Sequence, residues 1–216
     1  MIDLNTTIKN EFLRFLYSIL LPGAIISFPL TIFIVSNTDM QFLDLLGLNR
    51  LSVFISLLIF FSLILGYICE ILGAWIEAKY IDEIIDQKTN NSEFDRTWKE
   101  YLLIDAEYTK SIILVQYYRT LLTKFKFLIN FPLSLWGALL IYMILINMHH
   151  VNETFGVLKI NQCKLISISI IVISLISIFS FKRAITCGEI LHTSRKEILE
   201  LHRMAKFNAQ RIGSKH

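Results

Sequence analysis

The hydrophobic positions along this chain form four long runs, each bounded by charged residues. A helix rises about 1.5 Å per residue, so about 20 apolar residues are needed to cross a hydrocarbon layer of about 30 Å. The runs cover residues 15–38, 51–69, 127–148 and 165–181, and none contains Asp, Glu, Lys or Arg. The fourth run is the shortest and would cross with little tilt. The pattern predicts four transmembrane helices.

The basic residues are distributed unevenly around these runs. Eighteen of the 21 Lys and Arg residues lie before the first run, between the second and third, or after the fourth, and three lie in the other two loops. Loops rich in Lys and Arg remain in the cytoplasm. We therefore expect both termini and the long middle loop to be cytoplasmic. Charged residues precede a first run that is long enough to span, which predicts a retained helix rather than a cleaved signal.

Helical periodicity continues outside the four runs. The second helix is expected to extend past Trp75 to about Asp86, and an amphipathic helix from Glu93 is expected to lead into the third run. The predicted fold is all-α, a four-span transmembrane helical bundle whose helices extend into a cytoplasmic helical domain. Its expected parts are residues 1–75 (first two spans), 76–126 (cytoplasmic helical region), 127–187 (last two spans) and 188–216 (basic C-terminal helix).

Composition supports a membrane protein and argues against an enzyme. Hydrophobic residues make up 54% of the chain and charged residues 18%, against roughly 25% charged in soluble proteins. The three cysteines and the histidines show no metal-ligand spacing, and no phosphate-binding or nucleophile motif occurs. We expect no catalytic residue, metal or cofactor. The Ile-, Lys- and Asn-rich composition favours a bacterial source, and hence the bacterial inner membrane.

Charged residues near the inner membrane boundary are the first candidate site. Glu70 lies twenty residues after Arg50, about 30 Å along a helix, and an acid at such a depth is a candidate for a gate or ion pathway. The alternative is a structural ion pair with Arg14. Glu77 lies on the same helix face and is expected to pair with Arg119.

A serine-rich face on the fourth run is the second candidate site. Such a face can line a wet pore or form hydrogen bonds between packed helices. The pore requires several copies of the chain, because four helices enclose little space. The candidate pore-lining residues are Ser167, Ser174, Ser177 and Ser180.

Four basic residues of the tail form the third candidate site. At 100° per residue, Arg195, Lys196, Arg203 and Lys206 occupy one arc of a helix. Such an arc can bind anionic lipid headgroups, a nucleotide or a nucleic acid. The alternative is a solvated face of a kind common on the cytoplasmic side.

The layout resembles small four-helix bacterial membrane subunits of anti-phage defence systems, of the Kiwa and Hailong kinds. The resemblance rests on Leu21-Pro22-Gly23, on Gly66-Tyr67 followed by Glu70, Gly73 and Glu77, and on Tyr118-Arg119 before the third span. It implies a homo-oligomer, with a tetramer as the expected number. Such an assembly conducts ions or senses membrane damage, and works with a soluble partner protein from the same operon.

Three functions remain open on the sequence. The first is a homo-oligomeric ion channel or membrane-depolarising effector controlled through its cytoplasmic helices. The second is a non-conducting membrane anchor or sensor that recruits a soluble partner. The third is a small transporter, which is disfavoured because no internal repeat occurs and no charge lies at mid-depth.

Overall fold

A computed structural model describes residues 12–38, 49–89, 112–147 and 162–213 of this 216-residue chain. Every element within these ranges is helical, which confirms the all-α prediction, and four helices are long and apolar enough to cross a membrane. Two of them include a short π-helical turn, η1 in the first and η2 in the second. The elements are η1 (Leu16–Leu20), α2 (Leu21–Asn37), α4 (Arg50–Ile76), η2 (Glu77–Ile81), α5 (Asp82–Thr89), α7 (Ile112–Asn147) and α9 (Gln162–Gly213).

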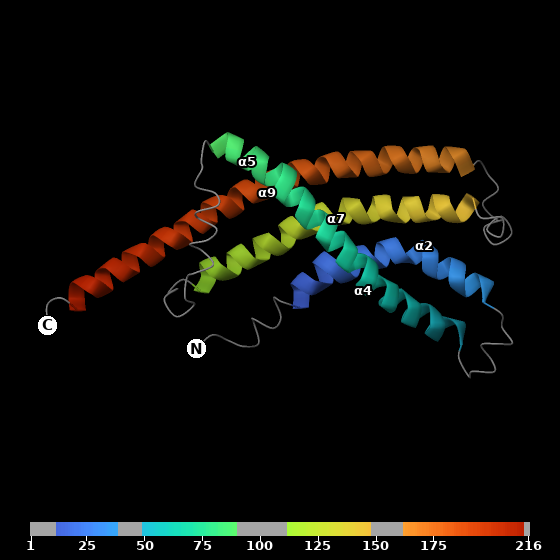
Figure 1. The fold of residues 1–216 in the computed structure, drawn as a ribbon, viewed down its shortest axis with the longest axis horizontal. Helices are drawn as coiled ribbons and strands as arrows, with labels where there is room; N and C mark the ends of the chain where they lie inside the picture. The colour runs from blue at the N-terminus through green and yellow to red at the C-terminus, as the bar shows by residue number, and fades with distance from the viewer. Residues whose placement is uncertain (1–11, 39–48, 90–111, 148–161, 214–216) are drawn as a thin grey trace.

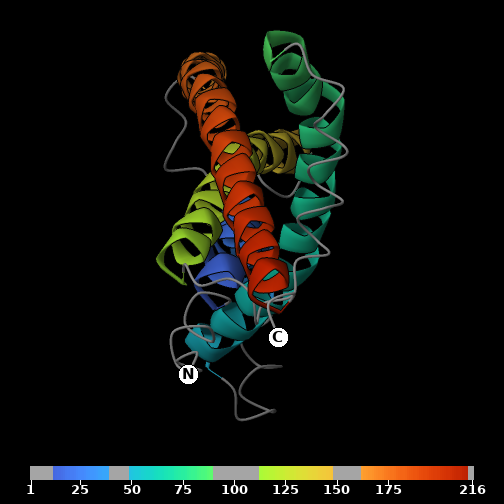
Figure 2. The same ribbon diagram turned by 90° about the vertical axis from the view of Figure 1, so that its left-hand side faces the viewer.

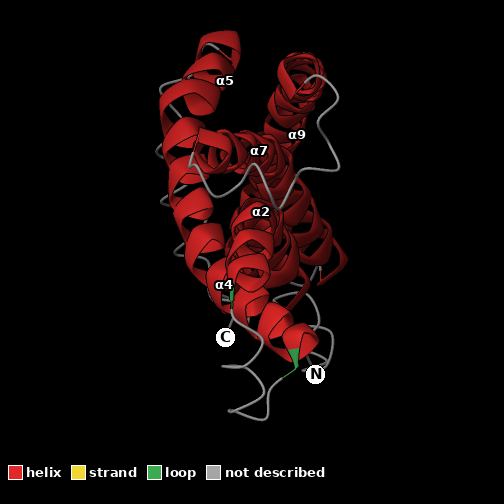
Figure 3. Cartoon of the chain, turned by 90° about the vertical axis from the view of Figure 1, so that its right-hand side faces the viewer, coloured by secondary structure: helices red, strands yellow, loops and turns green. Residues whose placement is uncertain are grey.

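The helices form two layers. α9, α7 and α2 lie side by side, and the helix made of α4, η2 and α5 crosses one face of that layer obliquely (Figures 1 and 3). α4 packs against α2 and α7, while η2 and α5 contact α9. Seen from the end of the bundle, α4 and α9 lie on different sides of the molecule (Figure 2). The second helix therefore meets α9 only towards its C-terminal end.

The outer helices of the bundle are thinly covered. In their most apolar stretches only 11% of the residues of α4 and of α9 are buried, against 39% for α2 and 33% for α7. Between α4 and α9, above α7, lies an apolar groove of about 750 Å³ whose walls include Leu72, Trp136 and Ile170. The central pair α2 and α7 thus supports two helices whose apolar faces are open to the surroundings.

Glycine allows α2 and α4 to approach closely where they cross. A Cβ atom at Gly23 would overlap the backbone carbonyl of Ser62, and one at Gly66 would overlap the carbonyl of Ile19. Beside this contact the buried hydroxyls of Ser27 and Ser62 lie 3.2 Å apart in a hydrogen bond. Small residues and hydroxyl pairs are the usual means by which apolar helices pack without a hydrophobic driving force between them.

A cluster of buried apolar side chains lies at one end of the bundle, where η2 and α5 meet the first part of α7 and the middle of α9. We call this region the charged end, because most of the charged side chains in the described ranges lie there. Its core consists of buried side chains from three helices that are far apart in the sequence. They are Ile81, Ile85, Tyr118, Leu121, Phe125, Ile129, Ala184, Cys187, Leu191 and Ile198.

The predicted extensions of the membrane helices are confirmed where the structure describes them. The second helix continues through η2 and α5 to Thr89, and α7 begins at Ile112, whereas the helix predicted from Glu93 lies outside the described residues before that point. α9 has 52 residues, about 78 Å, so more than half of it extends beyond a hydrocarbon layer of about 30 Å. The boundaries expected after residues 75, 126 and 187 all fall inside helices, so no helix end marks the division into membrane and non-membrane parts.

The crossing of α2 and α4 gives the first testable prediction. We expect Gly66→Ala to lower the stability of the solubilised protein by about 1–3 kcal/mol, because backbone atoms of α2 cannot move aside for the methyl group. The matched control is Gly137→Ala, whose added Cβ would lie 3.2 Å from the flexible side chain of Ile26. Scanning fluorimetry in detergent measures both variants, and equal melting temperatures would show that the close approach is unnecessary.

Candidate functional site

A cluster of polar side chains lies where the first three helices meet near the charged end. Lys126 of α7 donates a hydrogen bond of 2.6 Å from Nζ to Glu77 Oε2, and the same Nζ lies 3.8 Å from Glu70 Oε1. The side chains of Lys126, Glu70 and Glu77 are 12%, 21% and 22% exposed. Glu77 lies seven residues after Glu70, about 10 Å further along the helix. Lys126 therefore contacts two carboxylates that lie at different depths.

Asn130 connects this ion cluster to the first helix. Its Nδ2 donates hydrogen bonds to Glu70 Oε2 and, at 2.9 Å, to the backbone carbonyl of Ser18. The thiol of Cys69 donates to the carbonyl of Asn130 at 3.4 Å. Asn130 is fully buried, and both hydrogens of its amide are used. One side chain of α7 therefore holds η1 and α4 in a defined position.

The Ser18 carbonyl lies where proline interrupts the regular hydrogen bonding of its own helix. In a regular helix it would accept from the residue four positions on, which is Pro22, and proline has no N–H. The chain there forms the π-helical turn η1, in which the Leu21 N–H bonds to Leu16 O. Asn130 thus supplies the donor that the proline removed, and satisfies a carbonyl that would be costly to bury unpaired.

Gly73 allows the amide of Asn130 to reach this position. A Cβ atom at residue 73 would overlap Asn130 Oδ1, the one amide atom for which the structure shows no hydrogen-bond donor. The oxygen therefore lies against the backbone of α4, while the nitrogen faces Glu70 and Ser18. The predicted alignment of Gly66, Glu70, Gly73 and Glu77 on one face of the second helix is consistent with this contact, since each packs towards α2 or α7.

Two carboxylates share one ammonium group in this cluster, an arrangement compatible both with a structural ion pair and with the gate predicted for Glu70. No group of three metal-ligating side chains occurs in the four described ranges. Polar groups at this depth in an apolar bundle commonly mark functional sites.

The predicted ion pair between Glu77 and Arg119 is wrong. The structure pairs Glu77 with Lys126, and the side chain of Arg119 is exposed and lines a pocket beside α7. Arg119 lies seven residues before Lys126, about 10 Å further from the apolar part of α7, so it is too far along the helix to compete. Glu70 contacts Lys126 and Asn130, and the exposed Arg14 accepts a hydrogen bond from Ser18 Oγ through its backbone carbonyl.

The serine face of α9 turns partly towards α7. Ser177 accepts a hydrogen bond of 3.0 Å from Trp136 Nε1, and Ser180 is buried. Ser174 and Ser177 also donate to backbone carbonyls of their own helix, at Ile170 and Ile173. Ser167 is exposed. The bond to Trp136 matches the alternative of hydrogen bonding between packed helices, and pore lining stays a prediction.

The four basic residues of the tail do not form one exposed surface. Arg195 is only 6% exposed, and its Nη2 lies 3.4 Å from the hydroxyl of Tyr118. Lys196 is half-buried and Arg203 is exposed, while the side chain of Lys206 lies outside the described part. The arc was predicted from helical rotation alone, but α5 and α7 cover the edge of it that contains Arg195. Lipid or nucleotide binding by the remaining residues stays a prediction.

Two members of the polar cluster were not among the predicted site residues. Lys126 was treated as the boundary of the third run, although its position at the end of that run placed it level with Glu70. Asn130 could have been recognised as a candidate site residue from its position, because it is an amide one turn inside an uncharged run. Its partner Ser18 could have been suspected from Pro22. Only the packing shows that the two residues meet.

We predict that Asn130→Leu destabilises the three-helix junction. Leucine removes the donor to the Ser18 carbonyl and to Glu70, and each buried group left without a partner costs about 1–3 kcal/mol. The control is Ser134→Ala, which removes a buried hydroxyl that bonds only within α7, to the carbonyl of Phe131. Thermal unfolding in detergent compares the two, and a loss for Asn130→Leu no larger than that for Ser134→Ala would exclude Asn130 as the junction.

Comparison with known proteins assigns neither a family nor a function to this chain. No protein-family model, no curated protein and no solved structure matches the chain. The resemblance to membrane subunits of defence systems therefore stays a prediction, and the function has to be argued from the geometry of the chain itself.

Proposed function

We propose that this protein is a bacterial inner-membrane protein with four transmembrane helices and a cytoplasmic charged end. Support comes from aromatic and basic residues that lie level with Lys126 on every helix. Tyr17 packs edge-on against Phe127 at 5.9 Å, and Lys79 lies 4.8 Å from the ring of Trp75. On α9, Arg183 lies 5.1 Å from the ring of Phe179.

Such residues are typical of the interface between hydrocarbon and water. Beyond this level the four helices expose large apolar side chains, such as Phe60, Ile168 and Leu175, each more than half exposed. In water an apolar surface of this extent would aggregate, whereas lipid would cover it. The distribution of Lys and Arg assigns the charged end to the cytoplasm, as the positive-inside rule requires.

Within the membrane, the protein acts as a non-conducting anchor or sensor that presents its cytoplasmic helices to a soluble partner. The observation that supports this most is the position of the buried apolar cluster, which lies at the charged end. The groove between α4 and α9 is lined by apolar side chains, so it offers ions no polar path.

The far end of α9 provides a surface for such a partner. Leu201, Met204 and Phe207 follow one another at helical spacing and are 47%, 56% and 64% exposed. An apolar strip outside the membrane favours contact with another protein. Because α9 is continuous, a partner bound there is joined to the membrane part by one rigid helix.

An oligomeric channel is the second candidate, and the polar cluster favours it. Glu70 and Asn130 lie one to two turns inside the level of Lys126, at a depth where charged groups often belong to ion pathways. A homo-oligomer could place these groups, and the exposed Ser167, near a shared axis. The possible role as a depolarising effector in anti-phage defence belongs to this candidate.

The topology is tested by reporter fusions. We expect a fluorescent protein fused after His216 to fold and fluoresce, and alkaline phosphatase at the same position to be inactive, because the C-terminus is cytoplasmic. Phosphatase fused in the loop between the first and second helices should be active. The opposite pattern at either position would contradict the proposed orientation.

Conduction is tested with purified protein in liposomes that hold a potassium gradient. The anchor predicts flux no greater than in protein-free liposomes. Flux that Ser174→Leu removes would establish the channel instead, since the Ser174 hydroxyl bonds only within α9 and its replacement spares the contact with α7. Ile178→Leu, on the exposed apolar face of the same helix, is the matched control.

A further inference from the structure

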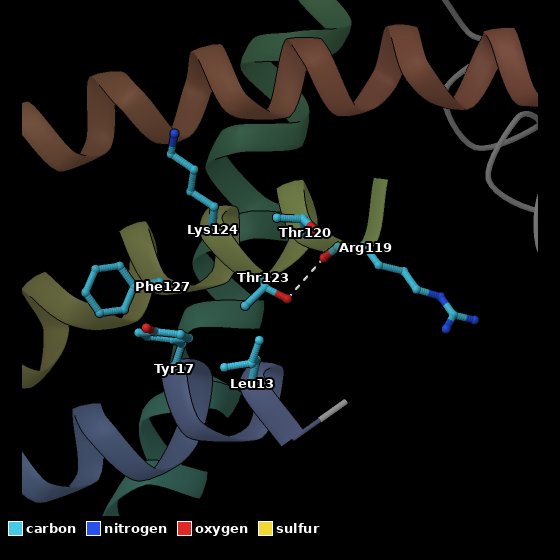
Figure 4. Close-up of a pocket in the computed structure, with 7 residues that line it drawn as sticks. All are labelled: Leu13, Tyr17, Arg119, Thr120, Thr123, Lys124 and Phe127. Carbon is cyan, nitrogen blue, oxygen red and sulfur yellow. Dashed lines mark hydrogen bonds between the residues drawn. The ribbon is translucent and has the colours of Figure 1, made fainter. Parts of the chain in front are cut away.

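A pocket separate from the polar cluster lies between the start of the first helix and α7. It has a volume of about 260 Å³ and is lined by Leu13, Tyr17, Arg119, Thr120, Thr123, Lys124 and Phe127. In Figure 4 it faces away from α4, which lies behind α7. Thr123 Oγ1 donates to the carbonyl of Arg119 at 3.0 Å, so this hydroxyl is held against the helix.

The lining of the pocket changes from basic to apolar along α7. Arg119 lies at one end and Phe127 at the other, eight residues or about 12 Å away. Tyr17, from the first helix, packs against Phe127 and closes the apolar end. Figure 4 shows Arg119 extending away from Phe127, and Lys124 extending towards α9. Both basic side chains are exposed, and neither forms an ion pair with another described residue.

The order of basic and apolar residues along the pocket matches the order of headgroup and acyl chain in a lipid of the inner leaflet. Tyr17 and Phe127 lie at the level assigned to the interface, while Arg119 lies on its cytoplasmic side. An amphiphile with its head towards the cytoplasm would place a charged group at Arg119 and its chain against the two aromatic rings. Basic pockets between helices on this side of a membrane are suited to anionic headgroups.

We propose that this pocket binds an anionic phospholipid, with the phosphate near Arg119 and an acyl chain against Tyr17 and Phe127. The inference rests on the proposed membrane insertion. Bound lipid would join the first helix to α7 about one turn from Lys126, and so would support the same helix pair that Asn130 connects. The apolar half of the pocket favours a lipid over free inorganic phosphate, which would contact only the basic end.

The test is native mass spectrometry of the full-length protein in detergent, titrated with dioleoyl phosphatidylglycerol or dioleoyl phosphatidylcholine. We expect the wild type to bind phosphatidylglycerol more tightly. Arg119→Gln should weaken that binding about five-fold, the effect of removing one basic contact near a membrane surface. Lys124→Gln should weaken it less, because the Lys124 side chain extends towards α9. Inorganic phosphate at the same concentration should not displace the lipid.

Two further variants separate the pocket from general attraction to a basic surface. Lys182→Gln with Arg183→Gln removes two exposed charges from α9 at a similar level and should leave the binding of phosphatidylglycerol unchanged. Thr120→Trp retains both basic residues but fills the pocket, and should weaken the binding of phosphatidylglycerol. The proposal is overturned if the two lipids bind equally, if the α9 variant loses as much as the pocket variant, or if Thr120→Trp has no effect.

These outcomes are independent of the topology test. Reporter fusions that contradict the proposed orientation would remove the inner leaflet as the source of the lipid, whereas equal binding of the two lipids would reject the pocket and leave the orientation intact.

Discussion

The buried amide of Asn130 is the constraint on which the arrangement of the first three apolar helices depends. An amide in an apolar bundle must use its hydrogens, and here they go to Glu70 on α4 and to the Ser18 carbonyl on the first helix. Pro22 leaves that carbonyl without its usual donor. Because one amide joins a residue from each of the other two helices, the rotation and depth of the three helices are set together, and Gly73 leaves the space in which they meet.

The charged end follows from this junction. Once Asn130 and Lys126 hold α4 against α7, the continuation of the second helix through η2 and α5 is directed towards α9, where Ile81 and Ile85 complete the core. The apolar halves of α4 and α9 diverge in the other direction and leave a groove between them. The cluster of buried apolar side chains thus lies at the charged end, whereas the apolar stretches of α4 and α9 are thinly covered.

The local sequence pattern was enough to predict the helices but not the contacts that their side chains make with other helices. Runs without charge predicted the four apolar helices, and unbroken periodicity predicted the continuation of the second helix and of the tail. The expected pair of Glu77 and Arg119 was wrong because depth along a helix was estimated without its crossing angle, and Lys126 lies nearer. Arg195 was assigned to an exposed basic arc, yet its side chain packs beside Tyr118, because α5 and α7 cover that side of α9.

The sequence by itself determined where helices form, how far they continue, and which stretches are too apolar for water. These properties depend on neighbouring residues and on hydrophobicity. The tertiary structure alone decided that Asn130 meets a carbonyl 112 positions earlier in the chain, that two acids share Lys126, and that basic and aromatic side chains of two helices form one pocket. Such contacts depend on the rotation and crossing of whole helices, which side-chain packing between distant segments sets.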